Sequence, residues 1–437
     1  MPDRSEVRIG EYGSALLRDS QLTPRDVNRL RALQAHGRLS LEQTPTGWRL
    51  KAGATVGLLV LDRIRLVMQP KFAIPGDRLM GWLAYALGAP APLPVTSRHW
   101  ATGPEGYADL VAAALLEQCQ QLLREGLRRD YVRRQNLEPV LRGRLDVAAQ
   151  TTLRYGQLDK LHVRTFGRET DIWDNRVLGT ALQVACVLTT SPDLARDLHT
   201  VADAFPNATP PEAALRALDR TRYTRLNARY RAAHTWARLL LRGGGVTDVL
   251  TDHGTAADGL LLAMPALWEA VVRRLVTDAA GDHGGHAVAG GGAAGITVRG
   301  DLGIGSAFRP DVLLGLPDRD PTARTLLPVD AKYKRYDHHS VSAADVHQLL
   351  TYSAGYTPSD DRRAVIVHPR TGGHSYRVLQ VDSPRGRLGD VHVLGVDTHT
   401  HPQQATAWLG SVLPLTNGDG LPSDTPGQAR GRCRGGP

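Results

Sequence analysis

The chain has 437 residues, of which 42% are hydrophobic and 22% charged, and this ordinary globular composition excludes wholesale disorder. No apolar run approaches the roughly 18 residues needed to cross a bilayer, and no apolar stretch follows the charged start MPDRSEVRIG, which argues against a secretory signal. The three cysteines, Cys119, Cys186 and Cys433, lie too far apart for a CxxC-type metal site, so we expect a cytoplasmic protein without a disulfide framework or membrane contact.

The net charge is +9, which suits a polyanionic partner but also suits simple solubility. Of the 53 basic residues only five are lysines: Lys51, Lys71, Lys160, Lys332 and Lys334. Lysine is a compact point charge, whereas arginine is a planar fork that hardly ever deprotonates. Where arginine is used almost everywhere else, each lysine merits inspection.

Residues 1–100 predict a β-rich domain. Residues 21–37 predict a helix, with Thr23 as the N-cap and Pro24 at the first helical position. The apolar runs 56–61 and 64–68 predict a hairpin that turns at Asp62-Arg63. A rigid loop or linker is expected at residues 89–94.

Residues 101–245 predict a helical middle region. Stretches 109–127, 175–188 and 226–241 have helical periodicity, while the prolines in 191–211 indicate looser structure. The glycines at 243–245 are expected to end this region.

Residues 246–415 predict an α/β domain, and the tail 416–437 is expected to be disordered because it lacks periodicity. A low-complexity loop is expected at 281–295. Helices are predicted at 265–279 and 343–354, and strands at 295–299, 308–316, 325–334, 363–367, 375–381 and 391–396.

The chemistry lies in two short motifs, RPD ending at Asp311 and, 19 residues later, DAK beginning at Asp330. Side chains alternate along a strand, so Asp330 and Lys332 share one face. If the two strands pair, two carboxylates and one ammonium converge in a site that we expect to face solvent. Mg²⁺ prefers such oxygen ligands, and the lysine would orient or help deprotonate the attacking water and stabilise charge on a phosphate. The pattern predicts Mg²⁺-dependent phosphodiester hydrolysis.

Neighbouring helices offer further groups. Glu269 would add a third carboxylate, and Gln348 lies one turn before Tyr352 on the same side of its helix. The alternative without function is a pair of surface aspartates and a salt-bridged lysine. His338 and His339 follow the lysine strand, but adjacent loop histidines are usually just exposed.

Several segments spread along the chain occur together in one known family. They are EYG at 11–13, VGLLVLDRIRLVMQPKF at 56–72, LRGRLDV at 141–147, ETDIWDNRVLGTAL at 169–182, FRPDVLL, VDAKYK and DVHQLLTY. With them the chain, from about residue 7 to 400, resembles the McrC family, the nuclease subunits of the McrBC 5-methylcytosine restriction system. The Asp311, Asp330 and Lys332 set also resembles the PD-(D/E)xK nuclease superfamily.

The resemblance implies an α+β multidomain chain with a C-terminal restriction-endonuclease-like domain that cuts double-stranded DNA with Mg²⁺. It implies that the N-terminal domain, residues 1–100, docks on a hexameric AAA+ GTPase, McrB, which binds the methylated DNA and is stimulated in return. Asp311 and Asp330 match the metal-binding acids, Lys332 the catalytic lysine, Glu269 the helical acid that completes the metal site, and Gln348 a glutamine on the following helix.

The LRGRLDV and DNR motifs lack evident catalytic chemistry. They form either a buried polar network or a contact surface, and we favour the network because buried charges persist only when paired. The residues concerned are Arg142, Arg144, Asp174, Asn175 and Arg176.

Two other functions stay open. One is a regulatory activator of an AAA+ NTPase whose nuclease site is vestigial, against which the intact acid and lysine set argues. The other is a stand-alone nuclease, against which the long N-terminal region argues. The chain has no GxxxxGK[ST] motif and no evident methylcytosine-reading element, so nucleotide hydrolysis and base recognition are expected on the partner. We expect partner activation before about residue 245 and cutting after it.

Overall fold

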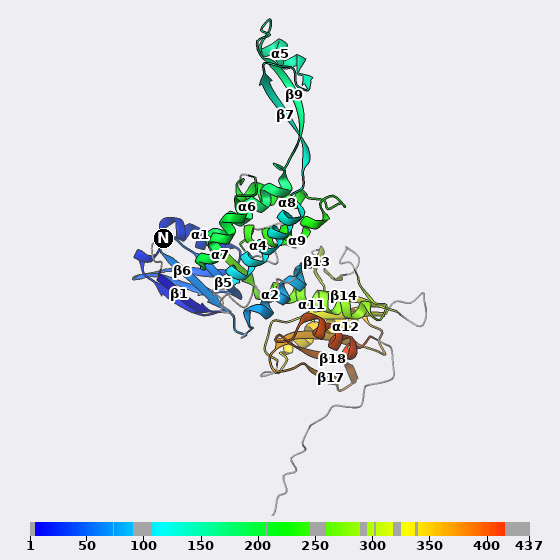
Figure 1. Cartoon of the computed structure of the whole chain (residues 1–437). Coiled ribbons are helices and arrows are strands. Elements are labelled where there is room, and N and C mark those ends of the chain that lie inside the picture. The colour runs from blue at the N-terminus through cyan, green and yellow to red at the C-terminus, as the bar shows by residue number, and fades with distance from the viewer. Residues whose placement is uncertain are drawn as a thin grey trace, which may run out of the picture.

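The structure, a computed structural model, describes residues 5–72, 74–90, 107–206, 208–243, 259–288, 295–300, 303–317, 325–336 and 340–415. Figure 1 shows an N-terminal part of β-strands, a bundle of helices from which a long hairpin projects, and a C-terminal part built on a mixed sheet. The chain is therefore mixed α and β, as expected. No described helix is both long and apolar enough to cross a membrane. The tail 416–437 and residues 289–294 of the predicted loop lie outside the described residues.

Two small sheets form the N-terminal part. The first has the order β1 (Ser5–Gly10), β6 (Ile64–Gln69), β5 (Thr55–Val60) and β10 (Gly259–Ala263), and the second β2 (Ser14–Leu17), β4 (Gly47–Ala52) and β3 (Leu39–Thr44). The predicted hairpin is confirmed, since β5 and β6 are antiparallel and the Leu61 N–H donates to the Ile64 carbonyl. The helix α1 (Pro24–Ala35) also begins as predicted, with the Thr23 hydroxyl accepting from the Asp26 N–H. The strand β10 comes from the range expected for the C-terminal domain, so the N-terminal sheet is completed from far along the chain.

The helical part confirms the three predicted helices and adds others. Residues 191–211 were expected to be loose, yet they contain one helix and lead directly into another. Pro192 and Pro211 stand in the first turns of these helices, where the missing N–H of proline leaves no hydrogen bond unmade. The helices are α2 (Gly76–Leu87), α4 (Tyr107–Glu125), α6 (Trp173–Leu188), α7 (Pro192–Ala202), α8 (Pro211–Arg220) and α9 (Arg231–Leu241), with short 3₁₀ turns at Asp19–Gln21 and Ala228–Tyr230.

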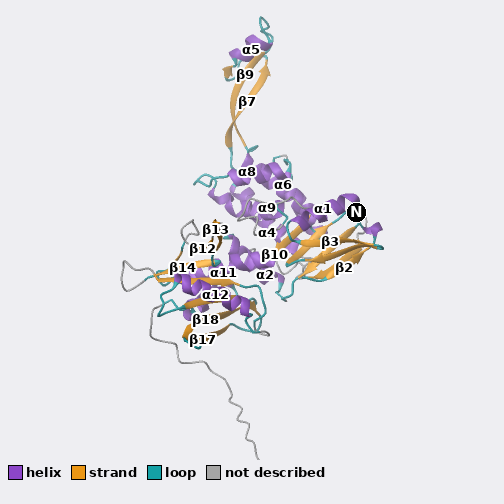
Figure 2. Cartoon of the chain, turned by 180° about the vertical axis from the view of Figure 1, so that it is seen from behind, coloured by secondary structure: helices purple, strands orange, loops and turns teal. Residues whose placement is uncertain are grey.

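A β-stranded arm, residues 130–169, projects from the helical part (Figures 1 and 2). Its strands β7 (Asp130–Glu138) and β9 (Leu161–Glu169) pair antiparallel along their whole length, while β8 (Arg144–Leu145) and α5 (Val147–Leu153) lie toward its far end. The helical pattern expected for the middle region is wrong here. The ribbon has solvent on both faces, so its sequence lacks the apolar alternation of a half-buried strand.

The C-terminal part is a six-stranded mixed sheet between helices. Its order is β11 (His286–Ala287), β14 (Val312–Leu316), β15 (Thr325–Ala331), β16 (Arg363–Arg370), β18 (Gly386–Asp397) and β17 (Ser375–Ser383), beside a ribbon of β12 (Ile296–Gly300) and β13 (Gly303–Phe308). Along β16, Ala364 and Ile366 pack in one small core with α12 (Ala343–Tyr356), whereas Val365 and Val367 join the main core with α11 (Met264–Gly281). A helix that was not predicted, α13 (Pro402–Val412), packs on α11.

One hydrophobic core extends through all three parts. It includes Val56 of β5, Leu178 of α6, Val271 of α11 and Val365 of β16. A domain boundary was expected near residue 245. The main core and the N-terminal sheet, however, both contain residues from either side of it. Residues 244–258, on the C-terminal side of that boundary, lie outside the described residues.

Candidate functional site

Two acidic side chains meet where β14 begins and β15 ends. The strands pair antiparallel, with Val312 opposite Val329, so the pairing on which the predicted site depends is present. Asp311, which directly precedes β14, and Asp330 therefore lie at the same end of the pair. The Ala331 N–H donates to Asp311 Oδ2 at 2.7 Å, which joins the two motifs directly.

Lys332 brings a positive charge to these acids. Its Nζ lies 2.6 Å from Asp330 Oδ2 and donates to Gln348 Oε1 at 2.9 Å. The strand was expected to run to residue 334 but ends at Ala331, and the Lys332 N–H is held by the Val367 carbonyl at 2.9 Å. Asp330 and Lys332 share one face, as alternation predicts.

The helix α12 closes one side of the site. Gln348 Nε2 donates to the Tyr352 hydroxyl at 2.9 Å and lies 3.5 Å from Asp330 Oδ1. The Tyr352 hydroxyl in turn donates to the Arg309 carbonyl at 2.6 Å. Gln348 thus touches both the acid and the lysine, and the RPD motif is tied to the same helix.

A second lysine holds the start of that helix. Lys334 Nζ lies 2.7 Å from Asp345 Oδ2, and the hydroxyl of Ser342 donates to the same carboxylate. Asp345 is in the first turn of α12, where a negative charge is favourable. Lys334 therefore orients α12, whereas Lys332 faces the two acids.

Burial and crowding determine the charge state of the site. Asp330 is only 1% exposed. The site was expected to face solvent, but it is buried at this point. Burial, then the neighbouring Asp330 carboxylate, raise the pKa of Asp311 to about 6. Burial also raises the pKa of Asp330, although Lys332 opposes the shift. Burial lowers the pKa of Lys332, but the hydrogen bond to Asp330 and the nearby carboxylates outweigh it and raise the pKa overall.

Glu269 is near the site without joining its hydrogen bonds. Its charge raises the pKa of both Asp311 and Asp330. Its side chain is 43% exposed, however, and pairs with Arg273 at 2.9 Å. Among the described residues no three His, Cys, Asp or Glu side chains are grouped as a metal site. Asp311 and Asp330 are the two carboxylates that could hold a hard cation here, and two crowded carboxylates with raised pKa values suit a divalent charge.

The ETDIWDNR motif forms the buried network that we favoured. Asn175 is fully buried, donates to the Arg128 and Thr170 carbonyls, and accepts from the Tyr230 hydroxyl. Asp174 pairs with Arg128. These contacts bind the base of the arm to α6 and to the 3₁₀ turn that precedes α9.

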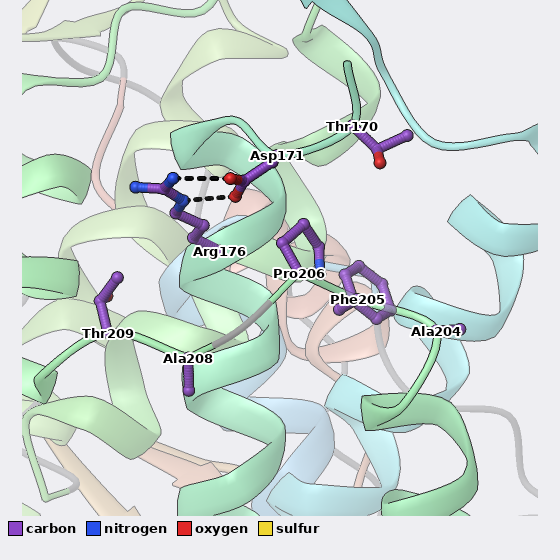
Figure 3. A pocket seen from close by; sticks show the side chains of 8 residues that line it. All are labelled: Thr170, Asp171, Arg176, Ala204, Phe205, Pro206, Ala208 and Thr209. Carbon is purple, nitrogen blue, oxygen red and sulfur yellow. Dashed lines mark hydrogen bonds and ion pairs between the residues drawn. The ribbon is translucent and has the colours of Figure 1, made fainter. Parts of the chain in front are cut away.

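Arg176 pairs with Asp171 at 2.6 and 2.8 Å beside a cavity of about 570 Å³ (Figure 3). The lining residues of this cavity are Thr170, Asp171, Arg176, Ala204, Phe205, Pro206, Ala208 and Thr209. They belong to the helical part, so the cavity is separate from the acids and lysine described above.

The LRGRLDV motif does not form a buried network. Arg142 and Arg144 are exposed on the arm, which fits a contact surface instead. Asp146 of the same motif is buried and pairs with Arg164 across the ribbon. His338 and His339 lie outside the described residues.

Two residues that the sequence did not assign to the site contact its strand from the N-terminal part. Lys71 Nζ donates to the Tyr333 carbonyl at 2.8 Å, and Glu11 Oε2 accepts from the Tyr333 hydroxyl at 3.3 Å. The rarity of lysine in this chain and the EYG motif were the available signals.

The chain is similar to known restriction-system proteins. The family described as "McrBC 5-methylcytosine restriction system component" matches residues 50–369. A chain of the refined half-complex of Thermococcus gammatolerans McrB AAA+ hexamers with bound McrC shares the fold, with a TM-score of 0.60 and 15% identity over 94% of this chain and 100% of that chain. A chain of the T. gammatolerans McrBC cryo-EM complex has a TM-score of 0.43 and 18% identity, covering 62% of this chain and 87% of that one. No curated protein matches in sequence.

Proposed function

The chain belongs to the family of McrBC 5-methylcytosine restriction system components, and from this membership we propose that it is the DNA-cutting subunit, a Mg²⁺-dependent endonuclease. In this proposal the C-terminal part is a PD-(D/E)xK restriction-endonuclease-like domain. The observation that carries it is the position of Lys332 Nζ, 2.6 Å from Asp330 and 2.9 Å from Gln348, beside the Asp311 carboxylate on the neighbouring strand.

Each residue has a role in the proposed reaction. Asp311 and Asp330 would hold Mg²⁺, which when bound supplies a Lewis acid beside the scissile phosphate. Lys332 would orient the attacking water and offset the negative charge that develops on the phosphate. Gln348 contacts the ammonium and the Asp330 carboxylate together, so it fixes their separation. Glu269 would serve as a third carboxylate after releasing Arg273.

We also propose that an AAA+ GTPase hexamer is the partner, that double-stranded methylated DNA is the substrate, and that the arm contacts the partner. Large apolar side chains that stay exposed in a group mark protein contact surfaces. The arm carries nine of them: Tyr131, Leu137, Val140, Leu141, Val147, Leu153, Tyr155, Leu158 and Phe166.

The second candidate is an activator of the partner with a vestigial nuclease site. The pairing of Glu269 with Arg273 favours it, because the third acid is then engaged elsewhere. Under this alternative the buried acids and lysine would only stabilise the sheet edge.

The substitution Asp330→Asn tests the proposal. It keeps the volume of this buried side chain and removes the negative charge, so it avoids the cavity that alanine would leave. We expect cutting of methylated DNA by the partner-bound chain in Mg²⁺ to fall by roughly a hundredfold or more. Stimulation of partner GTPase activity and the thermal midpoint should stay close to wild type.

Asp382→Asn, at an exposed position of β17, is the matched control and should cut normally. Cutting by Asp330→Asn at the wild-type rate would contradict the assignment of the metal ligand. A wild-type chain that stimulates the GTPase but never cuts would favour the activator.

A further inference from the structure

Lys71 reaches across from the N-terminal part to the residue after the candidate catalytic lysine. Its Nζ donates to the Tyr333 carbonyl at 2.8 Å. The same ammonium lies 4.3 Å from the centre of the Tyr333 ring, and 5.4 and 5.5 Å from the rings of Phe72 and Tyr12. A lysine ammonium over aromatic faces is attracted by their π electrons, and more strongly when it is partly removed from water.

Glu11 supports this contact from the turn between β1 and β2. Its Oε2 accepts from the backbone N–H of Lys71 at 2.7 Å and from the Tyr333 hydroxyl at 3.3 Å. The following Tyr12 has a φ of 62°, in the left-handed region that side chains other than glycine rarely adopt. At Gly13 an added Cβ would lie 2.9 Å from the Gly10 carbonyl oxygen. The EYG motif therefore builds a tight turn that presents Glu11.

A side chain of the C-terminal part also contacts residues 71–72. The Arg335 guanidinium donates to the Lys71 carbonyl and lies 5.1 Å from the centre of the Phe72 ring. The rings of Phe72 and Tyr333 meet edge to face, 4.9 Å between centres. Residues 71–72 and 333–335 thus form a junction between parts that are about 260 residues apart in the chain.

The junction helps to fix the position of Lys332. The backbone of three consecutive residues, 331–333, is held by three different segments of the chain. The Ala331 N–H is held by Asp311, and the Lys332 N–H by the Val367 carbonyl of β16. The Tyr333 carbonyl is held by Lys71. Since β15 ends at Ala331, the first two contacts hold the chain before Lys332, and Lys71 holds it afterwards.

We propose that Lys71 and Glu11 are positioning residues for Lys332, so that the N-terminal part completes the cutting site of the C-terminal part. The inference rests on the proposed nuclease function. The N-terminal part sets the position of the lysine by fixing Tyr333, in addition to any role in docking the partner.

The test compares Lys71→Met with Lys51→Met in the full chain assembled with its partner. Lys51 is an exposed lysine on β4, so its loss is a matched control. We expect Lys71→Met to raise amide hydrogen exchange over residues 330–336. Single-turnover cutting of methylated duplex DNA should slow by about tenfold to a hundredfold, the cost of a small displacement of a reacting group. The half-saturating Mg²⁺ concentration and the partner's GTPase rate should not change, because Asp311, Asp330 and the arm are intact.

A second variant covers the case in which Lys71→Met does not fold. Tyr333→Phe keeps the ring and loses only the hydroxyl that Glu11 accepts, and we expect smaller changes in the same direction. Exchange over 330–336 equal to that of the control would overturn the inference, as would raised exchange with an unchanged cutting rate. If the wild-type chain itself never cuts, the proposed function fails, and the exchange comparison still decides whether Lys71 holds this segment.

Discussion

The surroundings of Lys332 fit a small ammonium group, whereas most basic residues of this chain are arginines. Its compact ammonium fits between Asp330 Oδ2 and Gln348 Oε1, on a side chain that is only 19% exposed. A guanidinium is planar and larger, and it needs several acceptors in one plane. The neighbouring Lys334 makes a more exposed ion pair with Asp345. The two lysines of the VDAKYK motif therefore lie in different environments.

We accordingly expect Lys332→Arg to be inactive even though it keeps the charge. Cutting should fall by roughly a hundredfold or more, because the planar group displaces Gln348 or Asp330. Lys334→Arg is the matched control and should retain most of the activity, since the Lys334 side chain is 50% exposed and leaves room for a guanidinium to reach the buried Asp345. Gel-based cutting assays with the assembled complex measure both. Full activity of Lys332→Arg would mean that the residue supplies only positive potential.

The raised pKa of Asp311, about 6, predicts how Mg²⁺ binding depends on pH. The carboxylate binds the cation only when ionised, and burial together with Asp330 favours the protonated form. Mg²⁺ affinity should therefore be constant above pH 7 and fall by up to about tenfold per unit below pH 6, as one proton competes with the metal. Calorimetric titration of Mg²⁺ from pH 5 to pH 8 measures this. Constant affinity down to pH 5 would show that Asp311 is not a ligand.

At the scale of elements, the arm is the segment whose sequence is hardest to interpret. Its strands are nine residues each and bury little, yet they pair along their whole length. The base is held by the Asn175 network and by Arg134 pairing with Glu169, while the far end is rich in exposed apolar side chains. A segment held firmly at one end and apolar at the other is suited to entering a partner.

We expect the double substitution Tyr155→Ser and Leu158→Ser to weaken the partner complex. These side chains are 85% and 77% exposed, so their loss leaves no cavity and should not lower the thermal midpoint. If each is a contact residue that costs about 1 kcal/mol, affinity for the GTPase falls by roughly thirtyfold. Partner GTPase stimulation, titrated against chain concentration, measures this. Leu226→Ser, exposed outside the arm, is the control, and an unchanged double variant would remove the arm from the interface.

At the scale of the whole molecule, the N-terminal and C-terminal parts are joined by more than a linker. The strand β10 pairs with β5 in the N-terminal sheet and leads directly into α11, which carries Glu269. The Trp268 indole N–H then donates to the Val367 carbonyl of the C-terminal sheet. The N-terminal and C-terminal parts therefore share one continuous core.

This arrangement changes what we expect when the polypeptide is divided into two fragments after residue 243. The sequence predicted partner activation before about residue 245 and cutting after it, but a fragment that begins there would expose β10 and the face of α11 that packs on α2. We expect neither fragment alone to give a cooperative thermal transition by circular dichroism. Co-expression should restore the transition, because the fragments share the core. A cooperative melt of the C-terminal fragment alone would contradict this expectation.

The sequence by itself determined the features that depend on neighbouring residues. Alternation along a strand put Asp330 and Lys332 on one face, and the polar Asp62-Arg63 pair between apolar runs predicted the turn of the hairpin. The Thr23-Pro24 pair predicted the start of α1. The acid and lysine motifs lie next to apolar strand patterns, so the sequence predicted a common site on the condition that the two strands pair.

Tertiary structure decided the features that depend on distant contacts. Prolines 192 and 211 were interpreted as breaks, and only packing shows that they begin helices. The arm carries no half-buried alternation because solvent covers both of its faces. The junction of Lys71 with Tyr333 joins residues about 260 positions apart. Such contacts leave no periodic trace in a single sequence, because their free energy comes from burial that exists only once the parts have packed together.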